Sequence, residues 1–251
     1  MPHRGTLIPS VHSSLFEGEE ESAALAIGVL AVGDAVVPGL EDEYRAYSLL
    51  RGRVYLEEHF TTDDRLNPDG SETDPDDCRS IHFGVIENDR SNERHRMIGT
   101  MRLIAKSDAA DAPLPVEHHF PEIFKDAPAP PLSAEVSRLI CVHEHATLQN
   151  FCKWPLFTAA LTYTTAHNLA PIYAVVTERF RRILRHFGVP LSAIAEPRYI
   201  PEINATKQPT VVDTGALRAS ITRDDTRTRV FSDLQEAIAT RFVYLLPQDL
   251  P

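Results

Sequence analysis

The region from Trp154 to Gly188 constrains the fold most, because it places a short apolar strand pattern between two helical patterns. Residues 172–176 are continuously apolar, which is typical of a buried strand. Ahead of them, a helical pattern begins at Trp154 and stops before Pro171. After them, Thr177 is placed to cap a helix that ends at Gly188. The order helix, strand, helix predicts an α/β protein.

The first half of the chain adds another helix and several strands. Tyr47, Leu50 and Val54 recur at helical spacing, which predicts a helix over residues 41–58. Strands are predicted within residues 25–37 and over residues 80–87, 96–106 and 134–142, the middle two as an antiparallel hairpin. The full order is strand, helix, hairpin, strand, helix, strand, helix.

The chain of 251 residues is 43% apolar, which is enough to bury one substantial core. We predict a poorly ordered segment at residues 1–22, one domain over residues 23–204, and a C-terminal extension over residues 205–251. Ser232 and Gln235 have capping-box spacing ahead of a short helix in that extension.

Charge and cysteine content exclude several classes of protein. The formal net charge of −11 repels nucleic acid and gives no diffuse attraction to anionic membranes. The longest apolar stretch, residues 23–32, is too short to span a bilayer, so no membrane span is expected. Cys78, Cys141 and Cys152 are odd in number and lack CxxC spacing, which favours free thiols. A cytoplasmic location is expected.

The loop over residues 61–79 is rich in Asp, Pro and Gly, and it is long for a compact domain. Loops of this length are usually either functional or disordered. Transfer of an acyl group from a thioester to an amine needs a carboxylate that can deprotonate the amine. It also needs arginines that hold charged substrate groups. Glu135 provides such a carboxylate, and Arg51, Arg102 and Arg138 provide the cations.

Four motifs follow one another along the chain. They are Leu50-Arg51-Gly52-Arg53-Val54-Tyr55, Glu72-x-Asp74-x-x-Asp77, Gly99-x-x-Arg102 and Glu135-x-Ser137-Arg138. Over residues 45–190 the chain thereby resembles the autoinducer-synthase and N-acyl amino acid synthase branch of the GNAT-type acyltransferases. Three other stretches are similar to the exosortase-associated acyltransferases of the same branch: Arg53-Val54-Tyr55-x-Glu57-Glu58, Ser80-Ile81-His82-Phe83 and Leu114-Pro115-x-Glu117.

The resemblance implies a GNAT-like α/β (α+β) fold with a mixed, splayed central sheet flanked by helices. An acylated phosphopantetheine arm would insert between two diverging strands and serve as co-substrate, with no bound cofactor. The donor would be an acyl carrier protein or acyl-CoA, and the acceptor a small amine.

The resemblance also implies roles for individual residues. Glu135 would act as general base, directly or through water, with Ser137 nearby. The substrate-binding positions would be Arg51, Tyr55, Glu72, Asp74, Asp77, Arg102 and Arg138. Two structural alternatives stay open for the three acidic residues. They form a solvated acidic loop, or they form an ion-pair network with Arg51 and Arg102 that orders the acceptor pocket without touching substrate.

Strand alternation puts Glu135, Ser137 and Leu139 on one face, and Val136, Arg138 and Ile140 on the other. By this pattern Glu135 and Arg138 are not partners on one face. A structural glutamate and a packing serine therefore stay open as alternatives.

The acyl chain and the donor have their own candidate residues. Trp154, Phe157 and Ala174 are placed to line an acyl tunnel, although they are equally ordinary core residues. Arg179, Arg182 and Arg185 form a basic helical surface that would attract an acidic carrier protein, or would be an ordinary solvated face. The scattered histidines do not provide a defined zinc ligand set, so no metal is expected.

Two departures from the family narrow the function. Lactone-forming members carry a tryptophan where this chain has Phe60-Thr61, which disfavours S-adenosylmethionine as acceptor. A clear glycine-rich CoA-pyrophosphate loop is missing, which favours a carrier-protein donor. We predict N-acylation of an amino acid or similar metabolite with a medium or long acyl chain. The alternatives are an acyl-homoserine-lactone synthase and a non-catalytic acyl-carrier or acyl-lipid binding module.

Overall fold

The computed structural model describes residues 23–89, 94–106, 112–144, 146, 149, 152–186, 189–216 and 242–245. Within them the strands form one ten-stranded sheet in the order β10-β1-β3-β4-β5-β6-β9-β7, with β2 paired to β1 and β8 to β9. The strands are β1 (Ala23–Val32), β2 (Ala35–Val36), β3 (Ser80–Asp89), β4 (Arg94–Lys106), β5 (Ser133–Cys141), β6 (Ile172–Val176), β7 (Leu191–Ala193), β8 (Arg198–Ile200), β9 (Ala205–Val212) and β10 (Phe242–Leu245).

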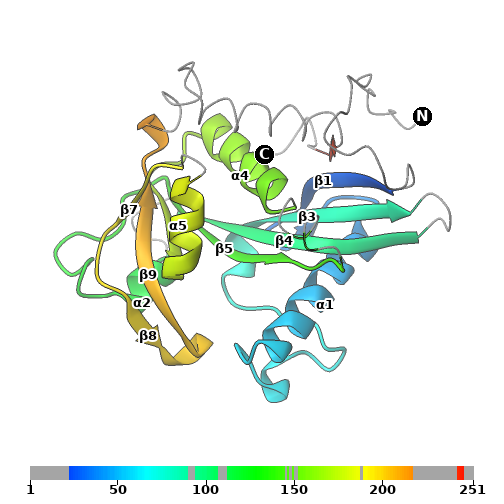
Figure 1. The fold of residues 1–251 in the computed structure, drawn as a ribbon, viewed down its shortest axis with the longest axis horizontal. Coiled ribbons are helices and arrows are strands. Elements are labelled where there is room, and N and C mark those ends of the chain that lie inside the picture. The colour runs from blue at the N-terminus through cyan, green and yellow to red at the C-terminus, as the bar shows by residue number, and fades with distance from the viewer. Residues whose placement is uncertain are drawn as a thin grey trace.

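Helices cover both faces of this sheet (Figure 1). They are α1 (Glu41–Glu57), α2 (Pro115–His119), α4 (Lys153–Ala166) and α5 (Glu178–His186), with 3-10 turns at Asp63–Arg65, Asp77–Arg79 and Pro201–Ile203. Helix α1 lies below β1, β3 and β4 in Figure 1, and α4 lies above them. Among the described residues no helix is both long and apolar enough to cross a membrane.

The sheet is mixed and splayed, as predicted. Strands β3, β4 and β5 pair antiparallel, whereas β5 and β6 run parallel. The β5–β6 pairing covers only Ala134–Val136 and Ile172–Ala174, after which the two strands continue without pairing to each other. The open end of this pair exposes backbone groups that a ligand can reach.

Most of the predicted elements are confirmed, including α1, the β3–β4 hairpin, β5, α4, β6 and α5. Helix α2 and strands β7, β8, β9 and β10 were not predicted. Strand β9 starts after residue 204 and pairs with β6, so the sheet continues beyond the predicted domain end. The segment 1–22 and the helix predicted after Ser232 lie outside the described residues.

The simple alternation predicted along β5 is wrong. Arg102 pairs with Ser137 and Thr100 pairs with Ile140, so Arg138 and Leu139 together oppose the single residue Met101. Arg138 has a left-handed φ of 55°, as one-residue β-bulges often require. Val136 and Leu139 pack into one apolar cluster, while Ser137 and Arg138 bind side chains on the opposite face. The bulge thus turns Arg138 to the same face as Ser137.

Helix α1 makes a close backbone contact at Gly52 with the loop over residues 61–79, which we call the acidic loop. The backbone N–H of Glu72 donates to the carbonyl of Ser48 in α1 at 3.0 Å. A Cβ atom added at Gly52 would lie 2.0 Å from the Gly70 carbonyl oxygen. Glycine at position 52 therefore allows the loop to lie directly against the helix.

Gly52→Ala should destabilise the protein by about 2–3 kcal/mol, because the added methyl group forces the loop away from α1. In an unobstructed helix the same change stabilises by about 1 kcal/mol, so the sign is diagnostic. Urea denaturation gives the free energy of unfolding, and Arg53→Ala at the neighbouring exposed position is the control. An unchanged or raised stability in Gly52→Ala would contradict the close packing.

Candidate active site

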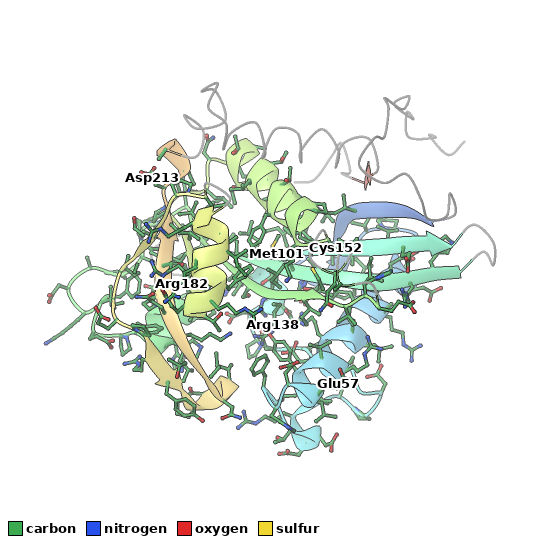
Figure 2. The ribbon with its side chains drawn as sticks, in the orientation of Figure 1. Glu57, Met101, Arg138, Cys152, Arg182 and Asp213 are labelled. Atoms are coloured by element: carbon green, nitrogen blue, oxygen red, sulfur yellow. The ribbon has the colours of Figure 1, made fainter. Side chains whose placement is uncertain are left out.

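A cavity of about 1040 Å³ opens where β5 and β6 diverge. Its walls come from residues 135–142 of β5 and the segment after it, residues 174–177 at the end of β6, the C-terminal turn of α1, and residues 72–76 of the acidic loop. Arg138 lies below β5 on the side of α1, where Glu57 marks the end of that helix (Figure 2). The cavity therefore connects the gap between β5 and β6 with the acidic loop.

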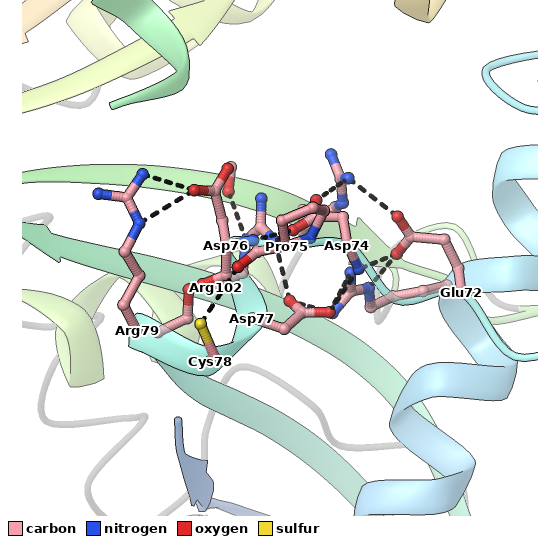
Figure 3. Close-up of polar contacts among 12 residues, drawn as sticks. Glu72, Asp74, Pro75, Asp76, Asp77, Cys78, Arg79 and Arg102 are labelled. Carbon is pink, nitrogen blue, oxygen red and sulfur yellow. Dashed lines mark hydrogen bonds and ion pairs between the residues drawn. The ribbon is translucent and has the colours of Figure 1, made fainter. Parts of the chain in front are cut away.

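Three arginines and three carboxylates form one largely buried network beside this cavity (Figure 3). Arg51 donates from Nε to Glu72 at 2.5 Å and from Nη1 to Asp77 at 3.0 Å. Arg102 donates from Nη1 to Asp74 at 2.5 Å and to Asp77 at 2.8 Å. Arg138 donates to Glu72 at 2.9 Å and also to Asp74.

The network is balanced in formal charge, and its pKa shifts follow from that pairing. Burial alone would raise the pKa of Asp77, but Arg51 and Arg102 outweigh burial and hold that pKa well below its ordinary range. Burial likewise opposes ionisation of Asp74, and Arg102 with Arg138 lowers its pKa. Both carboxyl groups are therefore ionised at neutral pH.

The network contains two kinds of position. Glu72, Asp74, Arg102 and Arg138 line the cavity. Arg51 and Asp77 lie behind them, and the Arg51 side chain is 0% exposed. The ion pairs of the structural alternative are therefore present, and the same network forms part of the cavity wall.

His82 supports the network from the sheet. Its Nε2 lies 3.1 Å from the Asp77 carbonyl oxygen, and its Nδ1 lies 3.2 Å from the Tyr47 hydroxyl. Burial lowers the pKa of His82 to about 4, so the ring is neutral at pH 7 and Nε2 donates to the carbonyl. Sequence reasoning placed Tyr47 on a helix face and His82 in a strand, but it did not predict this contact.

Glu135 lies at the start of the divergence between β5 and β6. It pairs with Ile104 of β4 and Tyr173 of β6, and only 2% of the residue is exposed. Its Oε2 accepts a hydrogen bond from the backbone N–H of Val116 at 2.7 Å. Burial raises the pKa of Glu135 to about 8, despite the opposing effects of that N–H and of Arg102. Such a carboxyl can exchange a proton near neutral pH.

Ser137 is held by the same network. Its Oγ accepts a hydrogen bond from Arg102 Nε at 3.1 Å, and the residue lines the cavity. Tyr55 also lines the cavity and lies under the Arg138 guanidinium, whose carbon is 4.8 Å from the ring centre. The structure therefore brings Glu135, Ser137, Tyr55 and Arg138 to one cavity.

The structure places two of the three predicted acyl-pocket residues at the cavity. Phe157 and Ala174 line the cavity, and Phe157 stacks on Phe180 with ring centres 6.0 Å apart. The side chain of Trp154 lies outside the described part of the structure. An apolar wall therefore continues from the open strands toward α4 and α5.

The predicted docking arginines Arg179, Arg182 and Arg185 are exposed on α5. Arg182 Nε donates to Glu178 at 2.9 Å, and Arg181 binds the same carboxylate. This surface is therefore less basic than the sequence alone indicates. In the described residues no group of three or more His, Cys, Asp and Glu side chains is arranged to hold a metal ion.

The fold is that of the GNAT-like acyltransferases. The sequence profile of the autoinducer synthase family matches residues 67–216, and the chain belongs to that family. No curated protein matches the chain.

Solved structures with the same fold share little sequence with this chain. The CoA-dependent acyl-homoserine lactone synthase BjaI is 19% identical with a TM-score of 0.65, over 90% of this chain and 95% of its own. The N-acyl amino acid synthase FeeM, from uncultured soil microbes, is 16% identical with a TM-score of 0.56, over 78% and 94%. The acyl-homoserine lactone synthase LasI is 17% identical with a TM-score of 0.51, over 76% and 89%.

Asp77→Asn should lower the free energy of unfolding by about 3 kcal/mol, because it leaves excess positive charge on buried Arg51 and Arg102. The matched control is Glu144→Gln, which breaks an exposed pair with Arg96 and should cost less than about 1 kcal/mol. Urea denaturation at pH 7 measures both. Equal stabilities of the two variants would show that the buried network does not hold the fold together.

Proposed function

We propose that this protein transfers an acyl chain of medium or long length from a phosphopantetheine thioester to the amine of an amino acid or similar small metabolite. The observation that carries the proposal is the buried carboxyl of Glu135, which faces the cavity where β5 and β6 separate. In this proposal the amine nitrogen attacks the thioester carbonyl, Glu135 takes the proton from nitrogen, and the thiolate leaves and is protonated. No covalent enzyme intermediate is needed.

The raised pKa suits this role. An α-amino group has an ordinary pKa of about 7.7–8.0, so a base with a pKa of about 8 is well matched to its proton. At pH 7 about one tenth of the molecules would carry ionised Glu135. The ionised fraction, and with it the rate, should rise as the pH approaches 8.

The donor side is supported by the open strands. Backbone N–H groups between β5 and β6 are available to pair with the amides of a phosphopantetheine arm and to stabilise the oxyanion. The apolar wall that includes Phe157, Ala174 and Phe180 suits an acyl chain. Exposed Arg179 and Arg185 on α5 favour an acidic carrier protein as donor, with acyl-CoA as the other source of the same arm.

The acceptor side is supported by the network. An amino acid carries one positive and one negative group, and the cavity wall presents both Arg138 and the carboxylates of Glu72 and Asp74. Because these charges are already paired, an acceptor would bind by sharing existing partners, with little net change in charge.

A second candidate is an acyl-homoserine-lactone synthase that uses S-adenosylmethionine. The fold match to BjaI, one of whose structures contains SAM and isopentyl-CoA, favours it. Phe60 disfavours it, because it stands where lactone-forming relatives are expected to carry tryptophan. Phe60 lines the cavity and packs edge-on against Tyr55, with ring centres 5.6 Å apart. Lactone and methylthioadenosine among the products would identify this reaction.

Cells that express the wild type should accumulate an N-acyl compound that is missing from cells expressing Glu135→Gln. With purified protein, Glu135→Gln should lower kcat by about 10²–10⁴-fold, because it removes the base and preserves the size of the side chain. Donor binding should be unchanged. Mass spectrometry of cell extracts measures the N-acyl compound, and a free-thiol assay measures kcat.

The control is Glu144→Gln, an exposed substitution outside the cavity lining, which should keep wild-type turnover. Full turnover by Glu135→Gln would remove Glu135 from the mechanism. The head group of the wild-type product distinguishes an amino acid acceptor from the lactone reaction.

A further inference from the structure

A second buried ion pair lies on the same face of the sheet as Glu135. Nζ of Lys106 at the end of β4 lies 2.9 Å and 3.1 Å from the two carboxylate oxygens of Glu117 in α2. The two side chains are 2% and 6% exposed, and neither residue lines the cavity. The proposed reaction makes no use of this pair.

Glu117 does more than neutralise Lys106. Its Oε2 accepts the backbone N–H of Leu114 at 2.7 Å, and its Oε1 accepts the backbone N–H of Ala129 at 2.9 Å. One carboxylate therefore joins β4, the start of α2 and the proline-rich segment that follows α2. Such a short helix is marginal alone, so its position depends on anchors of this kind.

The same helix start also contacts Glu135. The N–H of Val116, next to Glu117 in α2, donates to Glu135 Oε2 at 2.7 Å. The strand register places the two anchors side by side, because Glu135 pairs with Ile104 and Lys106 lies two residues further along β4 on the same face. Movement of α2 would therefore change the hydrogen bond to the Glu135 carboxylate directly.

We propose that Lys106 and Glu117 are a positioning pair for the acyl-transfer base: they fix α2 so that the Val116 N–H holds one oxygen of Glu135 and leaves the other oxygen for the acceptor amine. This inference rests on the proposed function only in the role given to Glu135. Since the Val116 N–H stabilises the carboxylate form, its loss should make Glu135 harder to ionise.

Leu114 and Ala129, which donate to Glu117, belong to one buried apolar cluster with Val116, so loss of the pair has a structural effect as well. If the pair were purely structural, its loss would lower the melting temperature without changing the titration midpoint of Glu135. A positioning pair alters the titration in protein that is still folded. The titration midpoint of Glu135 therefore separates the two roles.

The experiment is a pH titration of the full chain with ¹³C-labelled glutamate carboxyl groups, observed by NMR without substrate. Glu135→Gln assigns the signal. In Lys106→Met and in Glu117→Gln the midpoint of Glu135 should rise by about one pH unit or more. At pH 7, kcat/KM should then fall about tenfold, with donor KM unchanged. The control is Glu122→Gln, which breaks an exposed pair with Arg198 and should leave the midpoint in place.

Folded variants with the wild-type midpoint would overturn the inference, whatever their activity. If the single variants do not fold, the double variant Lys106→Met/Glu117→Gln carries the same titration, because it leaves no unpaired buried charge. The titration needs no acyl transfer, so absence of product from the wild type would count against the proposed function alone.

Discussion

The structure around the cavity depends on the pairing of three arginines, two of them fully buried, with three carboxylates. Arg51 comes from α1, Arg102 from β4 and Arg138 from β5, and all three meet carboxylates of a single loop. A buried arginine without a carboxylate is strongly unfavourable, so each cation fixes the loop relative to its own element. The loop that forms one cavity wall is thus held from three directions, and its shape does not depend on apolar packing alone.

Two departures from regular strand geometry give this network access to the cavity. The bulge at Arg138 turns that guanidinium to the face of Ser137, and the separation of β5 from β6 leaves backbone groups free beside Glu135. Without the bulge, strand alternation would put Arg138 among the apolar residues under α4. The irregularity of β5 therefore adds Arg138 to the place where the loop over residues 61–79, the buried carboxyl and the open strands meet.

The sequence predicts the elements with strong periodicity. For the acidic loop it offers an ion-pair network as one of several alternatives, because oppositely charged residues are available to pair. It does not predict the bulge, since αL geometry at an arginine has no sequence signal comparable to glycine. Helix α2 is too short to show a helical period, and Pro209 within β9 obscures a strand pattern. The raised pKa of Glu135 depends on burial by segments far apart in the chain, so it could be inferred only from the folded structure.

The pH dependence of kcat/KM for acyl transfer tests most directly whether Glu135 is the base. The measurement uses two acceptors whose amines differ in pKa, because the amine itself also titrates. A rise that levels off near pH 8 with both acceptors, and that is missing in Glu135→Gln, is the predicted result. A profile that follows only the amine pKa, and is the same in Glu135→Gln, would contradict the account.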